Sequence, residues 1–272
     1  MQLSDSILDH LDALFNEVVR AVTTGDPDEW GELGHNPKGD QVKWFDLAAD
    51  RAVSTYLQER FPYSVRLWSE EGEARSFGSA EPEFVIVLDP VDGSNNFARG
   101  IAPAGMAVAL LPANRPITVE NVQYALVGDI FSGITWTAAR GKGAHSSNQP
   151  LSTSEVTRLE EAILSCDEDR FVMQAPLTDL LSRARGARAF GCASRSLVMV
   201  ATGSIDAHLD VRNLLTPENF LAPALIITEA GGLVTDPAGK PLPVIRAITD
   251  SFSIVATATP ELHQTLLHRL AE

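Results

Sequence analysis

The chain has 272 residues, of which 44% are hydrophobic and 21% charged, enough for a large buried core in one domain or two fused halves. The formal net charge of −15 repels nucleic acid and anionic membranes, so we expect neither as a partner. Two cysteines make no disulfide framework, and no signal peptide or long apolar run stands out, so we expect a soluble cytoplasmic protein.

The N-terminal third begins with apolar residues at helical spacing, which predict an amphipathic helix over residues 5–23. Residues 24–43 are rich in Gly, Pro, Asn and Asp and predict a loop. A second helix follows, with Ala49, Val53 and Leu57 on one face and Asp46 near its start. Judged from the residues alone, Asp46 stabilises this helix, because its negative charge interacts favourably with the dipole at the helix start.

A short apolar strand from Val65 ends in two adjacent carboxylates, Glu70 and Glu71. Such a pair is usually part of a solvated face. Here the pair ends a strand about twenty residues before the carboxylates Asp89 and Asp92, which also follow a strand. A functional role for the pair therefore stays open.

The stretch Phe84–Leu88 predicts a short buried strand. We expect Asp89 where this strand ends, a turn at Pro90, and Asp92 three positions after Asp89, followed by Gly93. Two carboxylates on such a turn can converge on one point, and Mg²⁺ in proteins usually takes one or two carboxylates. A plain polar turn capped by two Asp side chains is the alternative, and this stretch alone favours neither.

The remaining elements follow from the same patterns. Residues 105–111, 123–127, 134–139 and 141–144 predict strands, and residues 149–152 mark a boundary between two halves, 1–150 and 151–272. The second half predicts strands at 162–165, 205–212 and 253–257, and helices at 174–184, 197–202 and 261–270.

Asp89–Phe97 resembles the Asp-Pro-(Ile/Leu)-Asp-Gly-Thr-x-Asn-(Phe/Tyr) signature of the inositol monophosphatase family, which are lithium-sensitive, Mg²⁺-dependent phosphatases. Ser94 in place of Thr is the one chemical change at a polar position. Glu70 matches the family's Glu-Glu motif, and Glu229–Gly232 matches the end of its second signature. The resemblance implies an α+β fold, a layered α/β/α/β/α sandwich of the sugar-phosphatase type, and a homodimer.

The resemblance also implies roles for single residues. Glu70, Asp89 and the Val91 carbonyl would hold a first Mg²⁺, and Asp89, Asp92 and position 219 a second. The family has Asp at that last position, and this chain has Asn219, which keeps an oxygen but loses a charge. Asp46 and Ser94 would act on the attacking water, with Glu70 among the catalytic residues. Lys38–Asp40 lie where the family holds a third metal.

For the substrate, the resemblance implies contacts from Gly93, Ser94, Cys192 and Ala193. Cys192 is not expected to be a nucleophile, because no histidine is placed to activate it. Arg212 stands where inositol-selective members carry Glu. A guanidinium there suits a sugar phosphate, including one with a second phosphate, although a surface salt bridge explains Arg212 equally well.

The expected function is therefore a Mg²⁺-dependent phosphomonoesterase for a small phosphorylated polyol or sugar, of the inositol monophosphate or fructose 1,6-bisphosphate type. The alternative is a catalytically weakened homologue that binds a phosphorylated ligand or a partner, which Asn219 favours.

Overall fold

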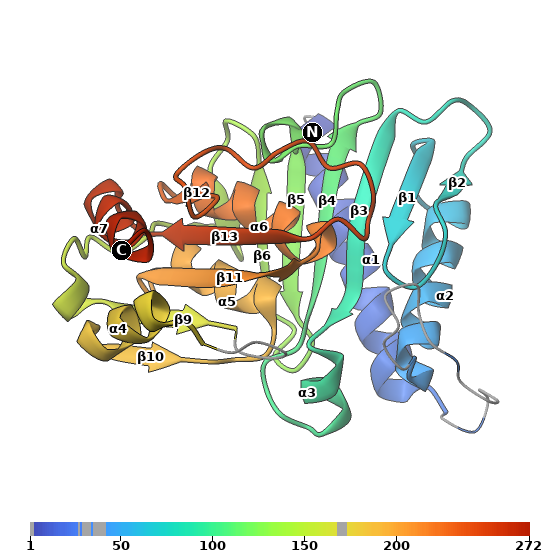
Figure 1. Ribbon diagram of the computed structural model, residues 1–272. Coiled ribbons are helices and arrows are strands. Elements are labelled where there is room, and N and C mark those ends of the chain that lie inside the picture. Colours follow the sequence, from blue (N-terminus) through green and yellow to red (C-terminus); the bar gives the residue numbers. More distant parts are fainter. Residues whose placement is uncertain (1–2, 27, 29–33, 35–41, 168–172) are drawn as a thin grey trace.

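The computed structural model describes residues 3–26, 28, 34, 42–167 and 173–272 (Figure 1). Its strands form two sheets. The larger sheet contains β1 (Val65–Ser69), β2 (Arg75–Phe77), β3 (Phe84–Asp92), β4 (Gly105–Pro112), β5 (Tyr124–Asp129), β6 (Thr135–Ala139), β7 (Ala144–Ser146) and β8 (Gln149–Pro150), in the order β2-β1-β3-β4-β5-β6-β7-β8. The smaller sheet contains β9 (Ile163–Cys166), β10 (Gly186–Arg188), β11 (Ala207–Leu215), β12 (Leu233–Thr235) and β13 (Phe252–Thr257), in the order β10-β9-β11-β13-β12.

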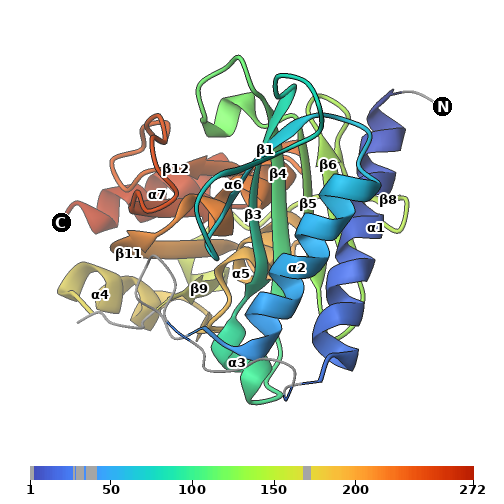
Figure 2. The same ribbon diagram turned by 90° about the vertical axis from the view of Figure 1, so that its right-hand side faces the viewer.

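Three pairs of helices alternate with the two sheets. The helices are α1 (Leu3–Thr24), α2 (Trp44–Glu59), α4 (Ala175–Arg183), α5 (Ala193–Ala201), α6 (Pro217–Glu229) and α7 (Pro260–Leu270), with a short α3 (Ser94–Ala98) after β3. Figure 2 shows α1 and α2 on one side of the larger sheet and α4 and α7 at the opposite side of the molecule. Helices α5 and α6 pack between the sheets, so the predicted α/β/α/β/α sandwich is confirmed.

Three apolar cores fill the spaces between these layers. Strand β3 contributes to two of them, because successive side chains of a strand point to opposite faces. Val85 and Val87 pack with α5 and α6, whereas Ile86 and Leu88 pack with α1 and α2. The core around α6 joins residues from both halves of the chain, which fixes the two halves against each other.

Strand β3 differs from the expectation in one important way. It does not end at Asp89 but continues to Asp92, and the chain turns at Gly93 instead of Pro90. The register with β4 shifts between Asp89 and Asp92, which marks a bulge. A strand tolerates proline at a bulge, because no ladder hydrogen bond is needed from that residue.

Other boundaries also differ. Helix α5 begins at Ala193, four residues earlier than expected, and β11 continues three residues beyond Arg212 to Leu215. Helix α3 and strands β2, β10 and β12 were not predicted. Lys38–Asp40 lie outside the described residues. Across the described ranges, every helix is too short or too polar to cross a membrane.

Candidate functional site

The bulge in β3 brings two carboxylates to one side of the sheet. Asp89 and Asp92 are three positions apart, and in a regular strand they would point to opposite faces. The extra residue of the bulge turns the side chains of Asp89 and Asp92 to the same face of the sheet. Asp89 contacts α6 and Asp92 contacts α5, and both helices lie on the same face of the larger sheet.

Asp89 is almost completely buried, with 2% of its surface exposed. One carboxylate oxygen accepts the Val91 N–H at 2.9 Å, and the other accepts Nδ2 of Asn219 at 2.7 Å. Both carboxylate oxygens of Asp89 therefore have a hydrogen-bond donor.

Asp92 is held by the start of α5. Its Oδ2 accepts the Ser194 N–H at 2.7 Å and the Cys192 thiol at 3.3 Å. Burial raises the pKa of Asp92, and these donors, with Ser194 foremost, act against that rise. The thiol is buried as well, and burial together with the Asp92 charge raises the pKa of Cys192 well above its usual value. Cys192 is thus a packed, protonated thiol, which agrees with the expectation that it is not a nucleophile.

The Gly93 turn needs its glycine. Its φ is +79°, a region that favours glycine, and a Cβ there would lie 3.0 Å from the Cβ of Cys192. This close approach packs the signature turn directly against the start of α5, where Cys192 and Ala193 lie.

Glu70 comes to the site from the neighbouring strand. Strands β1 and β3 are parallel, and Ser69 pairs with Leu88. Glu70 and Asp89 are the next residues of the two strands, at the same edge of the sheet. The register therefore places these two residues side by side, where β1 ends and β3 continues.

Asp46 is the third residue of α2 and is 5% exposed. Its Oδ2 accepts the backbone N–H of Lys43 at 2.8 Å, which is a helix-capping contact. Burial and, to a smaller extent, the charge of Glu70 raise the pKa of Asp46 to about 6, against the opposing hydrogen bond and charge of Lys43. The structure thus couples Asp46 electrostatically to Glu70, and the cap role and a site role are compatible.

Two further residues at the site were not singled out by the sequence reasoning: Lys43, which contacts the signature, and Asn96, which belongs to it. Nζ of Lys43 donates to Oγ of Ser94 at 3.0 Å. Nδ2 of Asn96 donates to the carbonyls of Pro103 and Phe190, at 2.9 and 2.7 Å. Its position within the signature is the sequence feature from which Asn96 could have been identified as a site residue.

Asn219 lies where the ungapped comparison with the family's second signature puts it. Its amide nitrogen faces Asp89, and its Oδ1 accepts the Thr216 hydroxyl at 3.1 Å. In this arrangement the side chain offers Asp89 a hydrogen-bond donor where a carboxylate would offer a negative charge.

Arg212 forms ion pairs, as the structural alternative expected, but its side chain is largely covered by the protein. Its side chain is 11% exposed, and its guanidinium bonds Asp210 at 2.7 Å and Asp167 at 3.4 Å. The charge of Asp167 contributes to the raised pKa of Asp92, so this ion pair lies within electrostatic range of the β3 carboxylates. Two carboxylates already share the guanidinium, which leaves less of its charge for a second phosphate.

The donor set fits a hard divalent cation in part. All the candidate ligands are oxygens, as Mg²⁺ prefers. Within the described ranges, no three His, Cys, Asp or Glu side chains are grouped to hold one ion. The ligand sets expected from the resemblance have two carboxylates per ion, with the Val91 carbonyl beside Glu70 and Asp89. Asn219, expected as the third ligand beside Asp89 and Asp92, faces Asp89 with its N–H₂ group.

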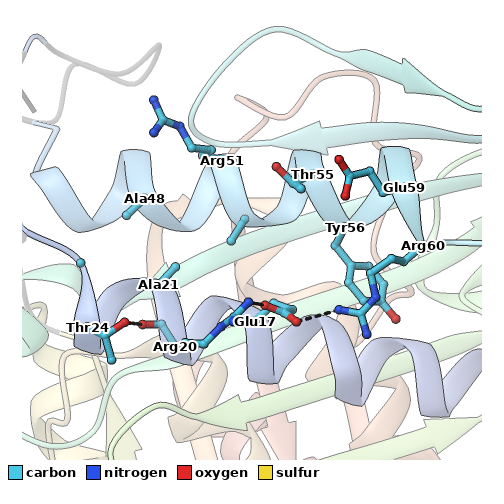
Figure 3. A pocket seen from close by; sticks show the side chains of 12 residues that line it. Glu17, Arg20, Ala21, Thr24, Ala48, Arg51, Thr55, Tyr56, Glu59 and Arg60 are labelled. Carbon is cyan, nitrogen blue, oxygen red and sulfur yellow. Dashed lines mark hydrogen bonds and ion pairs between the residues drawn. The ribbon is translucent and has the colours of Figure 1, made fainter. Parts of the chain in front are cut away.

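Two hollows flank α2. The groove in Figure 3, of about 480 Å³, runs between α1 and α2 and includes none of the candidate site residues. Arg20 and Arg60 at its rim are ion-paired with Glu17. The other hollow, of about 650 Å³, is lined by residues of α1, α2 and α3 together with Lys43. It is the one that borders the signature turn.

These features define a class of protein: a five-layered α+β sandwich with two buried carboxylates, Asp89 and Asp92, at a bulge of β3, the strand that runs parallel to β1. The chain belongs to the inositol monophosphatase family, whose sequence model matches residues 10–272.

Relatives and solved structures agree with this assignment. The chain is 31% identical to a fructose-1,6-bisphosphatase/inositol-1-monophosphatase of Methanothermobacter thermautotrophicus, over 93% of this chain and 92% of that protein. It is 28% identical to the protein of the same description from Thermococcus kodakarensis, over 88% and 87%. Its fold matches the IMPase of Thermotoga maritima with a TM-score of 0.78, at 22% identity, over 98% and 97% of the two chains.

Proposed function

We propose that this protein is a Mg²⁺-dependent phosphomonoesterase that hydrolyses a small phosphorylated polyol or sugar. The observation that carries the proposal is the bulge of β3, which turns Asp89 and Asp92 to one side, next to Glu70 on the parallel strand. Family membership and the names of relatives such as the archaeal fructose-1,6-bisphosphatase/inositol-1-monophosphatases support the same reaction.

The ligand assignment follows from this arrangement. Glu70, Asp89 and the Val91 carbonyl would hold one ion, and Asp89, Asp92 and Asn219 a second. When bound, such ions supply a nucleophilic water at neutral pH and neutralise charge on the phosphoryl group. A chain with a formal net charge of −15 needs that neutralisation before it can bind a phosphate.

The protein's own groups would handle the proton and the phosphate. Asp46, with a pKa raised to about 6, is ionised above that pH and basic enough to accept a proton from water. The Ser94 hydroxyl would orient the water, and Glu70 beside Asp46 would help to keep the water in place. The backbone N–H groups of Gly93 and Ser94 would receive the phosphate.

The substrate side is formed by the start of α5 and by Arg212. Cys192 and Ala193 would line the site through their backbone, because the Cys192 thiol is buried against Asp92. Arg212 would bind the far end of a sugar phosphate, in competition with Asp210 and Asp167. The proposed substrate is of the inositol monophosphate or fructose 1,6-bisphosphate type, and this competition does not separate the two.

The decisive experiment is phosphate release from a panel of inositol monophosphates, fructose 1,6-bisphosphate and 3′-phosphoadenosine 5′-phosphate, titrated with Mg²⁺. We expect Mg²⁺-dependent release from at least one polyol or sugar phosphate, with the rate falling below about pH 6 as Asp46 becomes protonated. The absence of release from every substrate at saturating Mg²⁺ would refute the proposal.

A second candidate function rests on Asn219. Its contact with Asp89 supports a weakened homologue that binds a phosphorylated ligand without turning it over. Binding of the same panel, measured by calorimetry without product formation, would favour this alternative.

We further propose a cytoplasmic homodimer. Both cysteines are buried thiols, as expected for a reducing compartment. The large apolar side chains Ile101, Phe131 and Ile134 are 43–51% exposed near α3, which supports self-association there. Sedimentation of the wild type and of Phe131→Ser tests this, and a monomeric wild type would refute it.

A further inference from the structure

Lys43 joins two segments of the site that are far apart in the sequence. Its backbone N–H caps α2 through Asp46, at 2.8 Å, and its ammonium donates to Oγ of Ser94 at 3.0 Å. The ring of Phe45 lies 5.8 Å from the ammonium and packs edge-on against Phe97 at 4.8 Å between centroids. The start of α2 and the signature turn are therefore held together by one polar and one aromatic contact.

The chemistry of this contact has a direction. An ammonium group has three donors and no acceptor, so Ser94 must accept from Lys43 with a lone pair. The hydroxyl hydrogen of Ser94 then points away from Lys43. A serine side chain also rotates about χ1 more freely than the threonine of the family signature, and the Lys43 contact restricts that rotation.

The backbone of Lys43 acts at the same place. Its N–H donates to Oδ2 of Asp46 at 2.8 Å, so Lys43 contacts both groups that would act on the attacking water.

We propose that Lys43 is a positioning residue of the site, whose ammonium fixes the Ser94 hydroxyl and whose backbone N–H holds the Asp46 carboxylate. This inference rests on the proposed function where it concerns turnover. Lys43 acts through Ser94 and Asp46 and takes no part in bond breaking.

The test compares Lys43→Gln, Lys43→Arg and the control Lys142→Gln, which removes the same charge from an exposed turn. With the substrate that the panel identifies, Lys43→Gln should lower kcat about 10- to 100-fold and change KM less than about threefold, as for one lost charge-assisted hydrogen bond. Lys43→Arg should recover much of the rate, and Lys142→Gln should match the wild type.

A double-mutant cycle with Ser94→Ala shows whether Lys43 acts through Ser94, because coupled residues are non-additive. The double variant should be no slower than Ser94→Ala alone. Fully additive losses in kcat, or a Lys43→Gln variant with an unchanged rate, would overturn the proposal.

A readout without turnover separates this inference from the proposed function. The three-bond couplings of Ser94, measured by NMR, should report one χ1 rotamer in the wild type and averaging over several rotamers in Lys43→Gln. If no substrate is turned over, the phosphatase proposal fails, yet these couplings still decide on Lys43. Identical Ser94 couplings in a folded variant would refute the positioning role.

Discussion

Replacing Asn219 by Asp should have opposite effects on the metal-free and Mg²⁺-bound protein. In the structure the Asn219 amide donates to the buried Asp89 carboxylate at 2.7 Å. Asn219→Asp removes this donor and places a second carboxylate against the first. Two unit charges about 4 Å apart repel by about 4 kcal/mol at an effective dielectric constant of about 20.

Part of that repulsion is relieved, because such a pair binds a proton. The lost hydrogen bond to a charged group costs about 1.5–3 kcal/mol. We therefore expect the free energy of unfolding of the metal-free protein to fall by about 2–4 kcal/mol, and its Tm by roughly 5–10 °C.

With Mg²⁺ bound, the added carboxylate of Asn219→Asp should be favourable instead of destabilising. The added carboxylate completes the Asp89 and Asp92 side, so the Mg²⁺ concentration for half-maximal activity should fall at least about tenfold, equivalent to about 1.4 kcal/mol. The affinity of the ion beside Glu70 should change little.

The assay is a thermal melt in EDTA and in Mg²⁺, together with a calorimetric Mg²⁺ titration. Asn148→Asp is the matched control, because it adds the same charge on an exposed turn. Superimposable melts and titrations of Asn219→Asp and the wild type would mean that Asn219 does not face Asp89 in solution. Activity gained from an inactive parent would identify the natural protein as a ligand-binding homologue.

Asp89→Asn should abolish phosphate release yet keep the fold, because an amide can still hydrogen bond to Asn219; full activity at saturating Mg²⁺ would refute the ligand assignment. Arg212→Ala should raise KM for a bisphosphate about 10- to 150-fold, far more than for a monophosphate. The same variant should have a lower Tm, because Asp210 loses its ion-pair partner. Equal effects on the KM of both substrates would mean that Arg212 has a structural role. His263 lies between two threonine hydroxyls, and burial lowers its pKa below 6.5. The folded protein thus favours neutral His263. Thermal melts should therefore show a Tm that falls as the pH is lowered from about 6.5 toward the folded-state pKa of His263. The variant His263→Gln should show a smaller fall. Finally, Cys192 should resist alkylation by iodoacetamide in the native protein and react after denaturation, as its buried, high-pKa thiol requires; rapid native labelling would contradict this.

The local sequence determined the elements and the chemistry of the site. Apolar periodicity located α1, α2, β3 and α7 to within a few residues, because each must bury one face or two. The Asp-Pro-x-Asp-Gly segment and the Glu-Glu pair pointed to hard oxygen donors, because such ligands follow from residue type alone.

Only the tertiary structure decided how these groups meet. A bulge at Pro90 brings Asp89 and Asp92 to one side, and the pairing of β3 with β4 creates it. The partner of Arg212 is Asp210, two residues earlier in the same strand, and burial by the surrounding layers makes that pair internal. The roles of Lys43 and Asn219 depend on contacts across 51 and 130 positions of the chain. Sequence patterns report the local preferences of a segment, whereas contacts over such separations exist only once the layers have packed.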